Sequence, residues 1–421
     1  MSMKRYSFRA YPTPVQVRAL SRVFGCVRMV FNDFIAERRR QHESGAAFEP
    51  ASVLARRVTT EAKQTPQRSW LAEVSAVPLQ QAVADADRAY RNFFDSLSGK
   101  RRGRKIGAPR FKSRHARRQT ARFTANSRFS VQTTTHGVGF VTLPKVGRVR
   151  FALSRELPSS PTSVTVIWEA DGTYHVSFVV DEQPALSAPM FEARVAGVDL
   201  GLTDYATVVY SDGTREKIAN PRYLRASERR LARAQKSLSR KVKGSRNSEE
   251  GRARVARLHS HVARQRLNHA HQTAARLVRE NQAVVVESLS ISGLARGWAA
   301  KSVHDAGWGT FLRVLREKAD HHGRLLQRAD RAFPSTRTCS ACGVVDSVKP
   351  LHIRDWHCAA CGAHLDRDYN AALNLMTLAG GQPERINACG REVRLALAQP
   401  ERAHPDETGT PRNDDGFHAA A

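Results

Sequence analysis

The chain has 421 residues, of which 41% are hydrophobic, and its 68 lysines and arginines against 39 aspartates and glutamates give a net charge of +29. This length allows two or three domains with their own cores, and the charge favours a polyanionic partner such as nucleic acid, since solubility alone needs far less. No apolar run approaches the roughly 18 residues of a membrane-spanning helix, and the N-terminus lacks the apolar core of a signal peptide. We therefore expect no membrane partner and a cytoplasmic location near the nucleoid, where cysteines are more often metal ligands than disulfides.

The first hundred residues predict one strand followed by helices. Residues 5–12 alternate apolar and polar side chains, as a half-buried strand does. Thr13-Pro14 then has the form of a helix cap followed by a proline at the first helical position. Apolar residues recur at helical spacing over 17–31, and again over 79–97. These residues therefore predict a strand and a helical unit.

Two segments carry most of the excess positive charge. Residues 100–118 hold ten lysines and arginines and no acid; they form either a solvated loop or a surface against which a polyanion lies. Residues 225–280 hold sixteen lysines and arginines and four acids, and leucines recurring every seven residues predict a helical hairpin that turns at Gly244-Ser245. Phe111 either stacks on a base or anchors its loop. The candidate nucleic-acid contacts are Lys100, Arg101, Arg102, Arg104, Lys105, Arg110, Lys112, Arg114, Arg229, Arg230, Arg233, Lys236, Arg240 and Lys241.

The segment 121–183 is predicted to be rich in β-structure. Apolar residues alternate on both sides of Asp171-Gly172, which is a strong hairpin signal. With the first strand of the chain, these strands predict a small antiparallel barrel. From residue 193 two strands joined by a tight turn are expected, then the basic hairpin, a buried strand beginning at Ala283, and one amphipathic helix over 302–323 that Asp305 could cap.

Four cysteines have the spacing of a structural zinc ribbon, C-x2-C-x15-C-x2-C. Four thiolates complete a tetrahedral set and leave no open position for water, so one structural zinc is expected and a catalytic zinc is not. Three nearby histidines are then surface or outer-shell groups, Cys26 belongs to a helix core, and Cys389 is a free thiol in the tail. The predicted ligands are Cys339, Cys342, Cys358 and Cys361, and the histidines are His352, His357 and His364.

Three acids stand in apolar surroundings. Asp199 lies in "AGVDLGLT", Glu287 in "AVVVESLS" and Asp368 in "DRDYNAALNL". A buried carboxylate costs several kcal/mol unless something neutralises it. Singly, each has an ordinary explanation, as a strand-end acid near a basic loop or, for Asp368, a helix cap. Together they form the minimal oxygen ligand set for two Mg²⁺ ions about 4 Å apart that hydrolyse a phosphodiester.

The chain resembles the TnpB (OrfB) family of transposon-encoded proteins, which are relatives of the compact type V CRISPR effectors. The resemblance rests on "AYPTPVQ", "FGCVRMVFN", "GAPRFKSR", "VAGVDLGLTDYAT", "VVVESLSISGL", "DAGWGTFLRVLREKA", "FPSTRTCSACG" and "CGAHLDRDYNAALNL", and runs to about residue 376. It implies that Asp199, Glu287 and Asp368 form a RuvC-like catalytic triad holding Mg²⁺ on a ribonuclease-H-like fold, and that Asp366 is a knuckle or solvent residue. It further implies an RNA-guided DNA endonuclease, in which a guide RNA from the transposon end (ωRNA) pairs with target DNA beside a short motif.

The implied fold class is α/β and multidomain, with a RuvC-like nuclease domain containing a zinc ribbon and an N-terminal small β-barrel containing a helical recognition domain. The expected boundaries are 1–12 and 119–190 for the wedge-like barrel, 13–118 for the recognition domain with its basic loop, 191–334 and 363–377 for the nuclease, 335–362 for the ribbon, and 378–421 for a flexible tail. Three alternatives remain at this point: a transposase that joins DNA ends, a nuclease-inactive RNA-guided regulator, and a zinc-ribbon transcription factor. The last leaves the buried acids unexplained, and a regulator would be expected to lose triad acids. We expect a monomer with one RNA.

Overall fold

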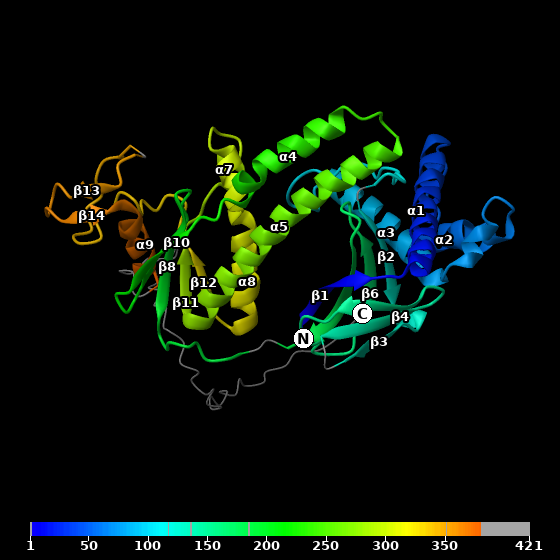
Figure 1. Cartoon of the computed structure of the whole chain (residues 1–421), viewed down its shortest axis with the longest axis horizontal. Coiled ribbons are helices and arrows are strands. Elements are labelled where there is room, and N and C mark those ends of the chain that lie inside the picture. Colours follow the sequence, from blue (N-terminus) through cyan, green and yellow to red (C-terminus); the bar gives the residue numbers. More distant parts are fainter. Residues whose placement is uncertain (1, 117, 135–136, 184–185, 351, 380–421) are drawn as a thin grey trace, which may run out of the picture.

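The computed structural model describes residues 2–116, 118–134, 137–183, 186–350 and 352–379. Most of the predicted tail, including Cys389, lies outside these residues. Figure 1 shows two β-sheet units, with the long helices α4 and α5 extending from one toward the other. None of the described helices is both long and apolar enough to cross a membrane.

The first sheet has seven strands in the order β2-β6-β7-β1-β5-β4-β3, all antiparallel. The predicted first strand and the Asp171-Gly172 hairpin are both confirmed, and the first strand lies in the middle of the sheet. Within the described residues no pairing joins β2 to β3, so the expected barrel is an open half-barrel. The strands are β1 (Ser2–Tyr11), β2 (Gln119–Thr124), β3 (Ser130–Thr133), β4 (Val138–Leu143), β5 (Gly147–Ala152), β6 (Ser163–Trp168) and β7 (Tyr174–Glu182).

The helical unit packs directly on this sheet. Its helices are α1 (Pro14–Glu43), α2 (Ala51–Arg56) and α3 (Ala76–Leu97), with a π-turn and 3-10 turns over 57–73. Thr13 begins α1 with a reciprocal capping box to Gln16, as the Thr-Pro pair predicts. One continuous core contains Phe8 of β1, Phe34 of α1 and Phe151 of β5. The helices and the half-barrel therefore share one core.

The second sheet has five strands in the order β10-β9-β8-β11-β12. Strands β8, β11 and β12 are parallel, whereas β9 and β10 are antiparallel to their neighbours. Helices α5 and α8 cover one face, and α9 covers the other. The strands are β8 (Val195–Asp199), β9 (Asp204–Tyr210), β10 (Arg215–Ala219), β11 (Ala283–Val286) and β12 (Leu325–Arg328). This α/β arrangement agrees with the expected ribonuclease-H-like fold.

The predicted basic hairpin is formed by α4 (Tyr223–Ser239) and α5 (Arg246–Glu280), and Ser245 caps α5 at the predicted turn. The hairpin reaches the first sheet, where Arg264 of α5 pairs at 3.1 Å with the buried Asp171 of the β6–β7 turn. This ion pair joins a helix of the nuclease side to the half-barrel.

The prediction of one capped helix over 302–323 is wrong. After α6 (Ile291–Leu294) the structure has two helices, α7 (Ala300–Ala306) and α8 (Trp308–His322), because Gly307 between them adopts φ +71°. Asp305 lies buried in α7 and accepts hydrogen bonds from the backbone N–H groups of Leu224 and Arg225. It therefore caps the start of α4, far away in sequence.

The ribbon ends in a short hairpin, β13 (Asp355–His357) and β14 (His364–Asp366), followed directly by α9 (Arg367–Thr377). Asp366 is the N-cap of α9, since its carboxylate accepts hydrogen bonds from the N–H groups of Asp368 and Tyr369. The expectation that Asp366 is only a knuckle or solvent residue is corrected by this contact. Because Asp366 caps the helix, the Asp368 carboxylate has no capping role.

Candidate functional site: a four-cysteine centre beside an acidic cluster

The four predicted cysteines converge. The Sγ atoms of Cys339 and Cys361 lie 3.7 Å apart, as do those of Cys342 and Cys358, and all four lie within 4.8 Å of one another. Sulfurs bound tetrahedrally to zinc at about 2.3 Å would be separated by about 3.8 Å. Backbone N–H groups of Cys361 and Ala360 lower the pKa of Cys358 to about 7, whereas desolvation and neighbouring sulfurs raise the pKa of Cys342 and Cys361, as expected of thiols crowded together without a metal. The residues present fit zinc.

The other cysteine and the histidines behave as predicted. Cys26 is buried in the α1 core, and burial raises its pKa to about 11. The His357 and His364 rings lie 4.7 Å apart on the exposed hairpin, and His352 is also exposed. In the part of the chain that the structure describes, none of these four joins the cysteine set.

Two of the three predicted acids emerge from neighbouring parallel strands at the same sheet edge. Asp199 is the last residue of β8, and Glu287 directly follows β11, where Val286 pairs with Val198. Asp368 lies in the first turn of α9, against the same sheet. Residues from three distant parts of the sequence are therefore brought to one edge.

The charges of two of these acids act on the third, Asp199. Burial raises the pKa of Asp199 well above its usual value, and the charges of Glu287 and Asp368 raise it further. Burial also raises the pKa of Glu287. Among the described residues only the cysteines form a set whose ligand atoms all lie within 4.8 Å of one another. The carboxylate oxygens of Asp199, Glu287 and Asp368 are therefore spaced more widely than the cysteine sulfurs. Hard oxygen donors carrying mutually repelling charge fit a divalent cation such as Mg²⁺.

A glycine lets α9 approach the strand that carries Asp199. A Cβ at Gly197 would lie 2.1 Å from the carbonyl oxygen of Ala372 and 2.4 Å from the backbone nitrogen of Met376. No side chain fits there without displacing the helix. Gly197 therefore sets the distance between β8 and α9, and with it the distance between Asp199 and Asp368.

Two asparagines on α9 bind the first zinc knuckle. Asn370 and Asn374 are buried, and both side-chain amides donate to the carbonyl oxygens of Ser335 and Thr338. Asn370 also accepts a hydrogen bond of 2.9 Å from the N–H of Ser340. The helix that carries Asp368 is thereby fixed to the metal ribbon.

An arginine of the ribbon contacts the acidic cluster directly. One guanidinium nitrogen of Arg354 donates to both carboxylate oxygens of Asp368, at 3.0 and 3.1 Å, and the other donates to the Thr203 hydroxyl at 3.1 Å. Asp366 pairs instead with Lys217 at 2.8 Å. The ribbon thus contributes a positive charge to the acidic site as well as a scaffold.

Sequence reasoning missed the roles of Gly197, Arg354, Asn370 and Asn374. The two asparagines carried a usable signal, because polar residues four apart lie on the same face of a helix that is otherwise apolar there. Arg354 carried no such sequence signal, because it is one of many arginines in a basic chain. Its contact with Asp368 becomes apparent only when the ribbon is placed against α9.

The predicted nucleic-acid contacts are largely unpaired. None of the fourteen basic residues forms an ion pair with an acid of the described chain. Lys112 differs from the others, because its ammonium lies 3.7 Å from the centroid of the Phe31 ring and burial there lowers its pKa, although part of its side chain is exposed. Phe111 likewise lies against Arg39. The end of the basic loop is therefore anchored on α1.

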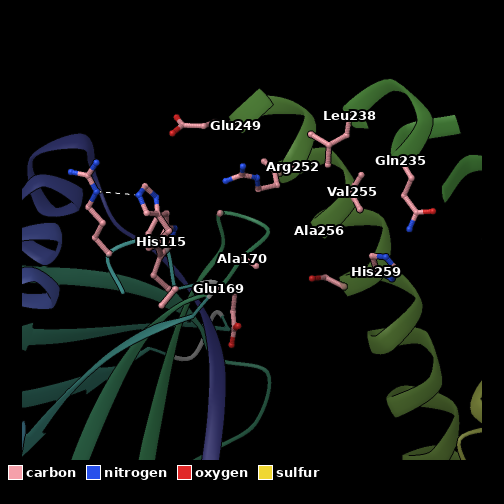
Figure 2. Close-up of a pocket in the computed structure, with 16 residues that line it drawn as sticks. His115, Glu169, Ala170, Gln235, Leu238, Glu249, Arg252, Val255, Ala256 and His259 are labelled. Atoms are coloured by element: carbon pink, nitrogen blue, oxygen red, sulfur yellow. Dashed lines mark hydrogen bonds between the residues drawn. The ribbon is translucent and has the colours of Figure 1, made fainter. Parts of the chain in front are cut away.

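The two basic segments face each other across a cavity of about 870 Å³. Figure 2 shows Arg252, Val255 and His259 of α5 on one side, and His115 of the loop with Glu169 of the β6–β7 turn on the other. Leu238 and Gln235 of α4 complete the helical wall. Residues predicted separately from charge runs thus line one space between the sheet units.

Three family models match the chain. The model for OrfB of IS605-type elements, described as "Probable transposase", matches residues 177–297. A "Cas12f1-like, TNB domain" matches 308–375, which includes the ribbon and most of α9. The OrfB helix-turn-helix model matches 1–46, the residues that form β1 and α1.

Curated relatives cover almost the whole chain. A Streptomyces pristinaespiralis protein named "Putative RNA-guided DNA endonuclease" is 39% identical over 93% of this chain and 92% of its own length. Similarly named proteins are InsQ of Escherichia coli K12, 28% identical over 96% of this chain and 98% of its own, and one from Mycobacterium tuberculosis, 30% identical over 89% and 86%.

Solved structures share the fold at low identity. The chain in the Cas12f1-sgRNA-target DNA complex has a TM-score of 0.53 at 10% identity, covering 89% of this chain and 98% of that one. The mini-RNA-guided endonuclease CRISPR-Cas_phi3 has a TM-score of 0.51 at 8% identity, covering 90% and 92%. From its near full-length relative and its matching family models, the chain belongs to the OrfB (TnpB) family of transposon-encoded proteins.

Proposed function

We propose that this chain is an RNA-guided DNA endonuclease of a transposable element, with Asp199, Glu287 and Asp368 as its catalytic acids. The observation that carries the proposal is the meeting of these three acids at one sheet edge, where burial and mutual repulsion raise the pKa of Asp199. A cluster of three carboxylates, partly neutralised by Arg354 on Asp368, favours a divalent cation. Names of the near full-length relatives point to the same activity.

In this proposal the acids hold two Mg²⁺ ions from three elements: β8, the end of β11, and the start of α9. When bound, Mg²⁺ would lower the pKa of the attacking water and stabilise the leaving oxygen. Asp199 and Glu287 are held by the rigid sheet, whereas Asp368 depends on the docking of α9 through Gly197 and the ribbon. The zinc site holds structure and takes no part in the reaction.

The guide RNA and its duplex with target DNA would lie along the basic loop 100–118 and the hairpin 225–280. Support comes from their unpaired charges and from the cavity that both line, with Arg114 and His115 facing Arg252 and His259. Base pairing would read the target sequence while the protein contacts backbone phosphates. For domains, we propose the boundaries given above, with the recognition helices 13–118 and the half-barrel acting as one body because they share a core.

The test uses the chain purified with its co-expressed transposon-end RNA and a plasmid that carries a matching target. Wild type is expected to cut in Mg²⁺, and Asp368→Ala is expected to slow cutting by about a thousandfold or more while RNA and target affinities change less than about threefold. The matched control is Asp355→Ala, an exposed acid of the same ribbon. A normal rate for Asp368→Ala would remove the triad assignment.

Digestion of the RNA before target addition separates the rival activity. A transposase that joins DNA ends needs no guide and would keep its activity, whereas the proposed nuclease would lose it. A nuclease-inactive regulator would bind the matched plasmid and never cut it. Sequencing the RNA that co-purifies would also reveal the guide and its scaffold.

A further inference from the structure

A small cavity of about 220 Å³ opens beside Glu287, between the ends of two parallel strands and helix α8. Its walls combine one acid, three arginines and a few apolar groups. The lining residues are Glu287, Leu289, Ile291, Gly309, Leu312, Arg313, Arg316 and Arg328.

The topology explains why arginines gather there. Strands β11 and β12 are parallel, and Arg328 pairs with Val286, so Arg328 reaches the same carboxyl edge as Glu287. On α8, Gly309, Leu312 and Arg316 are spaced three and four residues apart and so lie on one helical face. The buried Leu312 fixes that face against the sheet.

The charges in this cavity are not paired with one another. Arg313 is held by Glu317 at 2.7 Å. Arg316 and Arg328 are exposed and make neither an ion pair nor a side-chain hydrogen bond with any residue that the structure describes. Glu287 also forms no ion pair with them there. Two free guanidinium groups therefore flank a cavity beside a proposed catalytic acid.

The geometry points to a phosphate subsite, in which Arg316 and Arg328 hold a backbone phosphate of the DNA strand that is being cut. Arginine suits this ligand because its planar fork matches phosphate oxygens and remains charged. A phosphate held next to the reacting one keeps the strand in register with Asp199, Glu287 and Asp368, which makes both arginines positioning residues. The inference rests on the proposed nuclease function and adds its substrate contact.

The test couples the arginines to individual phosphates. Single-turnover cleavage by the RNA-loaded protein is measured for wild type and for the double variant Arg316→Gln, Arg328→Gln. Target strands carry one uncharged methylphosphonate at successive linkages on either side of the cut, never at the cut itself. On unmodified DNA the double variant is expected to cut about 10- to 100-fold more slowly, as for the loss of one charged hydrogen-bonded contact.

One methylphosphonate position should slow wild type by a similar factor and slow the double variant less than about twofold, because the lost contact is the same. Arg5→Gln is the control: Arg5 is exposed on β1 of the half-barrel and lies outside both basic segments. It should cut at the wild-type rate. Melting temperature and bound RNA should match wild type in every variant.

Three results would overturn the subsite: a double variant that cuts at the wild-type rate, one that remains fully sensitive to every methylphosphonate, or an Arg5→Gln variant that is equally slow. The second would assign the arginines to RNA phosphates instead of DNA. If wild type does not cut matched DNA at all, the proposed function fails, and that outcome is distinct from each of these.

Discussion

Arg354 of the zinc ribbon donates hydrogen bonds to both carboxylate oxygens of Asp368, the first-turn acid of α9, at 3.0 and 3.1 Å. The contact links the structural metal site to the proposed catalytic one. Half of the Arg354 side chain is exposed, at 49%, against 20% for Asp368. The arginine can therefore swing into solvent more easily than the acid can move, which makes it the exchangeable partner of Asp368.

We predict that Arg354→Gln lowers the Mg²⁺ concentration needed for half-maximal cleavage, by about three- to tenfold. A guanidinium on Asp368 competes with a divalent cation for the same oxygens, and glutamine removes its charge while keeping a donor. The measurement is a Mg²⁺ titration of cleavage by the RNA-loaded protein. Arg337→Gln, on the other knuckle, is the control, and a half-saturating concentration that stays equal or rises in Arg354→Gln would contradict the competition.

We expect Asp199 to lower the stability of the metal-free protein although cleavage depends on it. Its pKa is raised by burial and by the charges of Glu287 and Asp368. Between the unfolded pKa near 3.8 and this higher folded value, the folded state binds more protons than the unfolded state, so stability falls as pH rises through that window. Without Mg²⁺, ionisation of Asp199 as the pH rises through that window therefore destabilises the fold.

We expect Asp199→Asn, in zinc-loaded protein without Mg²⁺, to melt a few degrees higher than wild type near pH 8. The difference should shrink as pH falls, because the wild-type carboxyl then takes up its proton. Cleavage by the same variant should be undetectable. Thermal unfolding followed by circular dichroism across about pH 6–8 measures the difference, and a variant less stable than wild type near pH 8 would show that Asp199 is already compensated without metal.

Local patterns predicted the parts of this molecule whose causes are local. The cysteine spacing predicted which four cysteines converge, the Thr-Pro pair predicted the start of α1, and Asp171-Gly172 predicted the β6–β7 turn. Contacts between distant segments could not be predicted. Asp305 caps α4 by accepting a hydrogen bond from the N–H of Leu224, 81 residues earlier, and no short window of sequence contains that relationship.

The acidic site shows the same division. Each acid was identifiable because a charge in an apolar run needs an explanation, yet their spacing depends on how closely α9 packs on β8. Gly197 decides that distance, and in the sequence it is one of 26 glycines. Its role becomes apparent only when the facing backbone of Ala372 is placed.

We predict that Gly197→Ala abolishes cleavage while RNA binding is retained. The added methyl group would overlap the backbone of α9 and push the helix away, at a cost of about 1–3 kcal/mol in unfolding free energy. Gly25→Ala is the matched control, because Gly25 lies within α1 and its nearest contact would be 3.9 Å away. That change should be neutral or slightly stabilising. Cleavage assays and chemical denaturation measure both effects, and full activity in Gly197→Ala would mean that the separation of β8 and α9 does not control catalysis.

The last prediction distinguishes two steps: the binding of zinc by the ribbon, and the hydrogen bonds by which the ribbon holds the helix that carries Asp368. Asn370 and Asn374 hold the carbonyl oxygens of Ser335 and Thr338, so replacing both with alanine leaves those acceptors without their partners and frees α9 from the knuckle. We expect the double variant to keep its zinc, because all four thiolates remain, and to cut at least about tenfold more slowly, because Asp368 is no longer held in place. Cys358→Ser should instead lose both zinc and activity. Metal content by mass spectrometry beside cleavage rate distinguishes the two variants: normal cleavage by the asparagine variant would show that zinc alone places the helix, whereas loss of its zinc would show that these amides belong to the metal site itself.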